Sequence, residues 1–150
     1  MSGRFTLSMS PLSTQKPLRL YFENPVGRLW EDTDGYAIVE YNAGKRKLEE
    51  LQAFLTHASR LLHSRGWHKL LGDQRVMSAF TEEERVWITD NWLNTAASEG
   101  KSFYGAVLIA HDVFARLSMN LVMSEARESA LTYRLFESET EAHAWLRQLK

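Results

Sequence analysis

The stretch LLGDQRVMSAFTEEE, residues 70–84, runs from a short apolar segment through a polar turn into the start of a helix. Thr81 and Glu84 form a capping box, in which each side chain bonds the other residue's backbone N–H and marks a helix N-terminus. The apolar segment, taken as residues 67–73, has the length of an internal strand. The stretch therefore predicts a strand, a connecting turn and a helix.

Three strands are predicted before this unit. Residues 18–23 alternate between apolar and polar side chains, and residues 28–32 form a second short strand that closes at an Asp34-Gly35 hairpin signal. Residues 36–42 are rich in β-branched and aromatic side chains, which favour strands. We therefore expect the domain to open with a meander.

A long helix is predicted between the meander and the opening stretch. From Lys45 to Arg65 the apolar side chains recur at the helical period, and Gly66 stands where a left-handed C-terminal cap would lie. The basic cluster Lys45-Arg46-Lys47 is interpreted as the solvated start of this helix, although its charge is unfavourable at that end of the helix dipole.

The helix that begins at Thr81 is expected to run to about Ser98. On it, Trp87 and Trp92 are five residues apart, so they lie about 140° apart around the axis of a helix with about 3.6 residues per turn. One core-facing stripe does not cover both positions. We therefore expect one of the two side chains to be exposed.

Two more strands, each followed by a helix, complete the chain. Residues 103–110 form a continuous apolar run, typical of a strand covered on both faces, and Asp112 caps the next helix. Residues 131–137 alternate, and Ser138 with Glu141 repeats the capping box before the last helix. The helix after Asp112 is expected to face the core through Phe114, Leu117, Leu121 and Val122, with Met119 and Met123 on its flanks.

The predicted order of elements is βββαβαβαβα. This order favours a single α/β domain over residues 18–150, with a mixed sheet, parallel inner strands and helices packed mainly on one side. Residues 1–17 are rich in Ser and Pro and show no pattern, so we expect a disordered leader there.

Composition excludes several classes of function. The 150-residue chain has no cysteine, so it has no thiolate nucleophile, disulfide or cysteine-ligated metal, and this fits a reducing cytoplasm. A formal charge of −1 gives no broad field for holding nucleic acid. No apolar run approaches the roughly 18 to 20 residues of a membrane span. We expect a cytoplasmic protein with no nucleic-acid partner and no membrane span.

Four segments together resemble the STAS/SEC14-like family of small bacterial proteins, whose members look like anti-sigma factor antagonists. They are GDQR (72–75), TEEE (81–84), AVLIAHDVFARL (106–117) and YRLFESETEAHAWL (133–146). The resemblance covers about residues 18–149. It implies a STAS-like fold, and none of its motifs is a catalytic signature.

The resemblance also implies a specific difference in the turn. In the family's anti-sigma antagonists this turn carries Asp-x-Ser-Gly, and the serine accepts a phosphoryl group from a partner kinase. The present chain keeps Asp73 but has Arg75 at the serine position, and Ser78 lies three residues further on without a following glycine. The resemblance therefore implies a constitutive or differently controlled relative of the partner-switching factors.

A partner-binding or ligand-binding site is predicted at the turn 73–81 and on the helix after it. Its residues are Asp73, Arg75, Ser78, Thr81 and Trp87. They follow a predicted parallel strand at its carboxyl end, where open α/β sheets usually have their sites. Simpler interpretations stay open, namely a local Asp–Arg contact, a turn serine and a core tryptophan.

The leading hypothesis is a non-enzymatic regulatory module that binds a protein partner, either a regulator or a kinase-like protein. The alternative is a small apolar-ligand carrier of the SEC14-like type, because helices rich in Met and Trp could enclose a cavity. The sequence contains no recognisable nucleophile–base pair, paired-carboxylate motif or Gly-rich phosphate loop, and its five histidines lack metal-site spacing. We therefore expect no enzyme activity, cofactor or metal. A homodimer stays open, because edge strands and exposed aromatic side chains can pair.

Overall fold

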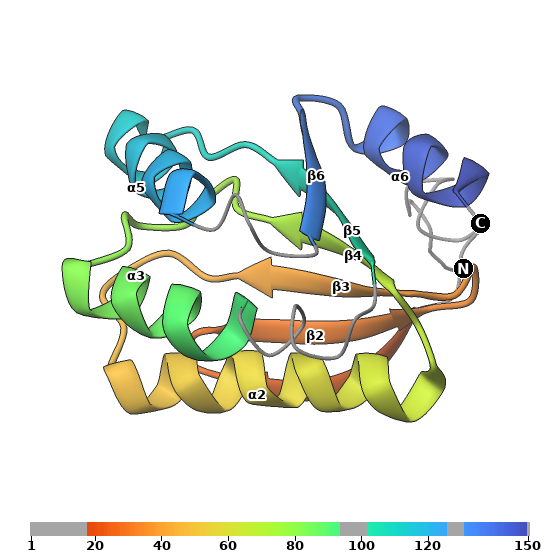
Figure 1. Ribbon diagram of the computed structural model, residues 1–150, viewed down its shortest axis with the longest axis horizontal. Helices are drawn as coiled ribbons and strands as arrows, with labels where there is room; N and C mark the ends of the chain where they lie inside the picture. Colours follow the sequence, from red (N-terminus) through yellow and green to blue (C-terminus); the bar gives the residue numbers. More distant parts are fainter. Residues whose placement is uncertain (1–17, 94–101, 126–130, 150) are drawn as a thin grey trace, which may run out of the picture.

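The computed structural model describes residues 18–93, 102–125 and 131–149. Six strands form one sheet in the order β1-β2-β3-β4-β5-β6, so neighbours in the sheet are also neighbours along the chain. The strands are β1 (Leu18–Asn24), β2 (Gly27–Asp32), β3 (Tyr36–Tyr41), β4 (Lys69–Asp73), β5 (Phe103–Leu108) and β6 (Leu131–Phe136). The helices are α2 (Leu48–Arg65), α3 (Glu82–Trp87), the π-helix η1 (Ile88–Leu93), α5 (Val113–Glu125) and α6 (Glu139–Gln148). This arrangement confirms the predicted α/β class with a mixed sheet (Figure 1).

The sheet has an antiparallel part and a parallel part. β1, β2 and β3 form the predicted meander, and the second turn ends at Gly35, whose φ of 91° lies in the left-handed region that favours glycine. From β3 to β6 all pairings are parallel. Each parallel connection passes through helices, because parallel neighbours need a crossover.

The helices divide unequally between the two faces of the sheet. α2, α3, η1 and α5 cover one face, where Val39 and Tyr41 of β3 join their apolar side chains in the main core cluster. α6 covers the opposite face, where Ala142 and Leu146 pack on Tyr36 and other residues of the central strands. In Figure 1, α2 and α3 run side by side, while α6 lies apart from both.

Some predicted boundaries shift in the structure. α2 begins at Leu48 rather than Lys45, and β4 begins at Lys69 rather than residue 67. The helix predicted from Thr81 is α3 followed directly by the π-helical turn η1, and the end of its predicted range lies outside the described residues, as does the predicted leader 1–17. Within the described ranges, no helix is both long enough and apolar enough to cross a membrane.

The core-facing stripe predicted for α5 is wrong at Phe114, Leu117 and Leu121 and right at Val122. The helix buries Ala115, Ser118, Val122 and Met123 and leaves Phe114, Leu117 and Leu121 exposed. The small residues are inside because α5 lies close to the loop before α3, where Ser118 Oγ accepts a hydrogen bond of 2.9 Å from the Phe80 N–H. The cap itself is as predicted, since Asp112 Oδ2 accepts from the Ala115 N–H at 2.9 Å.

A buried lysine holds the C-terminal end of α6. Lys69 Nζ donates to the carbonyl oxygens of Leu146 at 2.7 Å and Leu149 at 3.2 Å, at the end of the helix where the dipole favours a cation. We expect Lys69→Met to lower the free energy of unfolding by about 1–2 kcal/mol, because it removes the charge and both hydrogen bonds.

The matched control is Lys47→Met at the N-cap position of α2, where a cation is unfavourable. Urea unfolding should show no loss of stability for this variant. Equal losses at positions 69 and 47 would contradict the role given to Lys69.

Candidate functional site

The predicted turn begins with a bidentate ion pair between Arg75 and Asp73. Arg75 Nη2 donates to Asp73 Oδ2 at 2.8 Å, Arg75 Nε donates to Asp73 Oδ1 at 3.0 Å, and a third contact of 3.4 Å joins Arg75 to Glu139 on α6. The hydrogen bond with Asp73 raises the pKa of the Arg75 guanidinium above its usual value, although partial burial opposes this. The pair therefore stays charged and occupies the polar groups at the carboxyl end of β4.

A second ion pair, between Arg46 and Glu84, is buried and holds the rest of the turn in place. Arg46 donates to both carboxylate oxygens of Glu84, at 2.9 Å and 3.1 Å, and both side chains are only 4% exposed. The same guanidinium donates to the carbonyl oxygens of Ser78 at 3.0 Å and Ala79 at 2.9 Å. The interpretation of Arg46 as a solvated residue was wrong, because two carbonyl oxygens of the turn and the two carboxylate oxygens of Glu84 on α3 accept from its guanidinium and make its burial tolerable.

The other predicted site residues are bound into the same turn or its helix. Ser78 Oγ accepts from the Gly44 N–H at 3.1 Å, and Thr81 Oγ1 accepts from the Glu84 N–H at 3.1 Å in the capping box. Trp87 is half-buried and packs against the main core cluster. Of the five predicted site residues, only Asp73 and Arg75 contact each other directly through their side chains. That the five residues form a binding site stays a prediction.

Both tryptophans of the second helical segment face the core in part. Trp92 Nε1 donates to the Leu55 carbonyl oxygen of α2 at 2.8 Å, and its ring packs against the same cluster as Trp87. The expectation that one of them is exposed was therefore wrong. Its premise fails because the π-helical turn η1 begins at Ile88, which changes the angle between the two side chains.

An apolar surface lies on the outer side of α5. Phe114 is 68% exposed, and Leu117 and Leu121 follow it at a spacing that places all three on one helical stripe. Val113 beside them is also exposed. We call these four residues the α5 stripe. Large apolar side chains in such a row normally face a core, so an exposed row indicates a contact surface.

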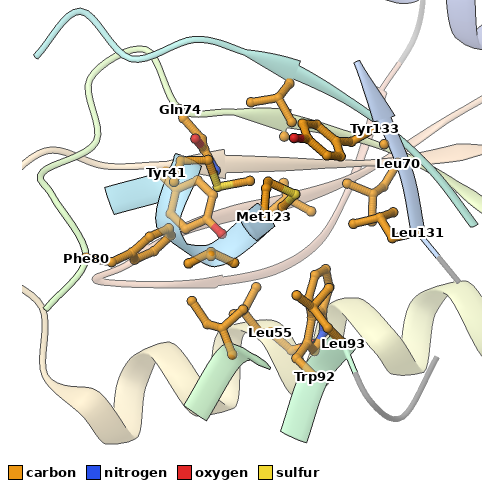
Figure 2. A pocket seen from close by; sticks show the side chains of 17 residues that line it. Tyr41, Leu55, Leu70, Gln74, Phe80, Trp92, Leu93, Met123, Leu131 and Tyr133 are labelled. Atoms are coloured by element: carbon orange, nitrogen blue, oxygen red, sulfur yellow. The ribbon is translucent and has the colours of Figure 1, made fainter. Parts of the chain in front are cut away.

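A cavity of about 50 Å³ lies between the helical layer and the sheet. Its floor consists of residues on four adjacent strands, including Gly72 on β4 and Gly105 on β5, and its other walls come from α2, η1 and α5. Figure 2 shows Trp92 and Leu93 of η1, Met123 of α5 and Leu131 of β6 around this space. From the sequence, only a cavity enclosed by helices rich in Met and Trp could be predicted. Its position could not, because Gly72 and Gly105 become neighbours only when β4 and β5 pair in the sheet.

The cavity wall contains two buried polar side chains. Tyr41 is 6% exposed, and its hydroxyl has no hydrogen-bond partner among the described residues. Burial raises the pKa of this phenol, so it stays protonated and able to donate. Gln74 is 4% exposed, and its side-chain amide donates at 3.2 Å to the Met119 sulfur, a weak acceptor.

A separate polar cluster joins α6 to the opposite face of the sheet. The Tyr36 hydroxyl is hydrogen-bonded to His143 Nδ1 and lies against the Asp32 carboxylate, and His143 Nε2 faces Glu139 at 3.7 Å. Burial, and then the charge of Asp32, raises the pKa of Tyr36 above its usual range. These contacts link β2, β3 and α6, so the cluster has a clear structural role.

In the part of the chain that the structure describes, no group of three or more His, Asp or Glu side chains is arranged so that it could bind a metal ion. Comparisons of the chain with protein-family models, curated proteins and solved structures found no match. The resemblance to the STAS/SEC14-like family therefore remains a hypothesis, and functional inference depends on the α5 stripe, the turn and the cavity.

Proposed function

We propose that this chain is a non-enzymatic protein-interaction module of the STAS-like type, with a regulatory role in the cytoplasm. The observation that carries the proposal is the α5 stripe, Val113, Phe114, Leu117 and Leu121, which is exposed although the same helix also packs on the core. Removing such apolar surface from water stabilises a complex by about 25 cal/mol per Å², so contact with a partner protein at the α5 stripe would be favourable.

The predicted turn supports a partner role less directly. Asp73 and Arg75 neutralise each other, and Thr81 serves the capping box, so these groups already have partners within the chain. Val76, within this turn, is an exposed apolar residue. We therefore place the main contact on the α5 stripe and treat the turn as a second surface that a partner could reach.

The decisive experiment is photo-crosslinking in host cells. A benzoyl-phenylalanine side chain at Leu117 should form a covalent adduct with one specific protein, identified by mass spectrometry, because an exposed apolar row is expected to be covered by a partner. The matched control is the same probe at Glu49, an exposed charged position on α2. A probe at Val76 tests the turn separately.

The outcomes distinguish the surfaces. An adduct at Leu117 that is lost when Phe114 and Leu121 are changed to Ser supports the α5 stripe, and these exposed substitutions should alter stability by only about 0.5 kcal/mol each. An adduct at Val76 alone moves the site to the turn. If neither probe yields a specific adduct, the interaction-module proposal is wrong. An adduct whose second protein is the same chain identifies a homodimer.

The lipid-carrier alternative has weaker support. A cavity of about 50 Å³ has room for only a few water-sized groups, far fewer than the methylenes of an acyl chain. The cavity is better suited to a much smaller molecule.

A further inference from the structure

We infer that the cavity under α5 is a binding site for a small, mainly apolar molecule that carries one hydrogen-bonding group. The apolar part would contact the Leu, Val and Met side chains of the wall, and the polar group would be received by the Tyr41 hydroxyl and the Gln74 amide. This inference does not depend on the proposed partner-binding role of the α5 stripe.

The first support is the unused hydrogen-bonding capacity in the cavity wall. A polar group that lines a cavity and has no hydrogen-bond partner in the protein can receive the polar group of a ligand. Among the described residues, Tyr41 has no hydrogen bond from its hydroxyl, and Gln74 reaches only the Met119 thioether. In Figure 2, Tyr41 and Gln74 lie close together at one end of the group of lining residues, with Phe80 beside Tyr41. A ligand polar group at this end would satisfy both.

The second support is the shape of the floor. A Cβ atom added to Gly72 would meet its nearest neighbour, the Ala106 carbonyl oxygen, at 4.0 Å, so a methyl side chain would fit at this strand position. Glycine weakens a strand interior relative to alanine, and a glycine there often marks a place where a ligand approaches the backbone. The open space above Gly72 belongs to the cavity.

The size of the ligand follows from the walls. At about 50 Å³ the cavity accepts only a few heavy atoms, but two of its wall residues are Met119 and Met123. Methionine side chains are unbranched and change rotamer readily. We therefore expect a ligand of one ring or a short chain, which enters by displacing these two side chains.

The test uses p-cresol and toluene, which differ by one hydroxyl, and protein labelled with ¹³C at the methionine methyl groups. We expect p-cresol to cause saturable shifts of the Met119 and Met123 signals, with toluene binding about 3-fold to 10-fold more weakly because it lacks one hydrogen bond. Met77 is the internal control, because it is buried in the same core cluster but does not line the cavity.

Two variants make the result specific. Tyr41→Phe should remove the preference for p-cresol over toluene, whereas Tyr36→Phe, on the opposite face of β3, should keep it. Gly72→Val should abolish the shifts with both probes by filling the cavity. The inference is overturned if neither probe gives saturable shifts, if Met77 responds as strongly as Met119 and Met123, or if Tyr41→Phe leaves the preference unchanged.

Discussion

Replacing Arg46 with alanine is expected to lower the free energy of unfolding by about 3–5 kcal/mol, the range found when one partner of a buried ion pair is removed. The variant leaves the Glu84 carboxylate buried without its cation and takes donors from the carbonyl oxygens of Ser78 and Ala79. The loss also removes the guanidinium from above the Phe80 ring, where it lies 5.1 Å from the centroid. Urea unfolding measured by circular dichroism provides the value.

The matched control is Arg28→Ala, which breaks an exposed pair with Glu23 at 2.7 Å. Exposed pairs contribute about 0–1 kcal/mol, so this variant should be nearly as stable as the wild type. The double variant Arg46→Met with Glu84→Leu should recover part of the loss, because it leaves no unpaired charge in the interior. A single Arg46→Ala variant as stable as Arg28→Ala would show that the turn is not held by Arg46.

Replacing Gly27 with alanine is expected to lower the free energy of unfolding by about 3 kcal/mol, at the upper end of the usual cost of overpacking. A Cβ atom at this position would lie 1.9 Å from the Glu40 carbonyl oxygen and 3.1 Å from the tip of the Phe54 ring. β2 pairs with β1 on one side and β3 on the other, so its backbone cannot move away without breaking a pairing. Thermal and urea unfolding should both report the loss.

Gly72→Ala is the control for this prediction, since it makes the same change in another strand of the same sheet. The new methyl group enters the cavity without a close contact, and replacing glycine in a strand interior can add about 0.5–1 kcal/mol of stability. We therefore expect a neutral or slightly stabilised protein. Equal losses of stability at positions 27 and 72 would mean that the close approach of β2 to β3 does not determine how strongly Gly27→Ala destabilises the protein.

Much of the fold was predictable from local patterns. The three strands of the meander, the Asp34-Gly35 turn, the long stripe of α2 ending at Gly66 and the capping box of Thr81 and Glu84 all appear in the structure. These features depend on side-chain periodicity and on backbone contacts within a few residues, so the chain encodes them locally. The pairing of Asp73 with Arg75 was likewise within reach, because the two residues are separated by one position.

The candidate surfaces were less accessible to sequence reasoning. On α5, the stripe of large residues and the stripe of small residues have the same helical period, and the sequence favoured the large one as the core face. The structure buries Ala115, Ser118 and Val122, of which only Val122 belonged to the predicted core face, since a nearby loop requires close approach and a hydrogen-bond acceptor for the Phe80 N–H. Which stripe is buried depends on what packs against the helix.

The sequence by itself determined the class of fold, the positions of most strands and helices, and the absence of cysteine chemistry, because each follows from composition or from neighbours along the chain. Only the tertiary structure decided that Arg46 is buried against Glu84, that the α5 stripe is exposed, and that Tyr41, Gly72 and Gln74 share one cavity. These outcomes join residues that are far apart in sequence or depend on which face is covered. Their physical cause is the packing of helices on a sheet, which local periodicity does not specify.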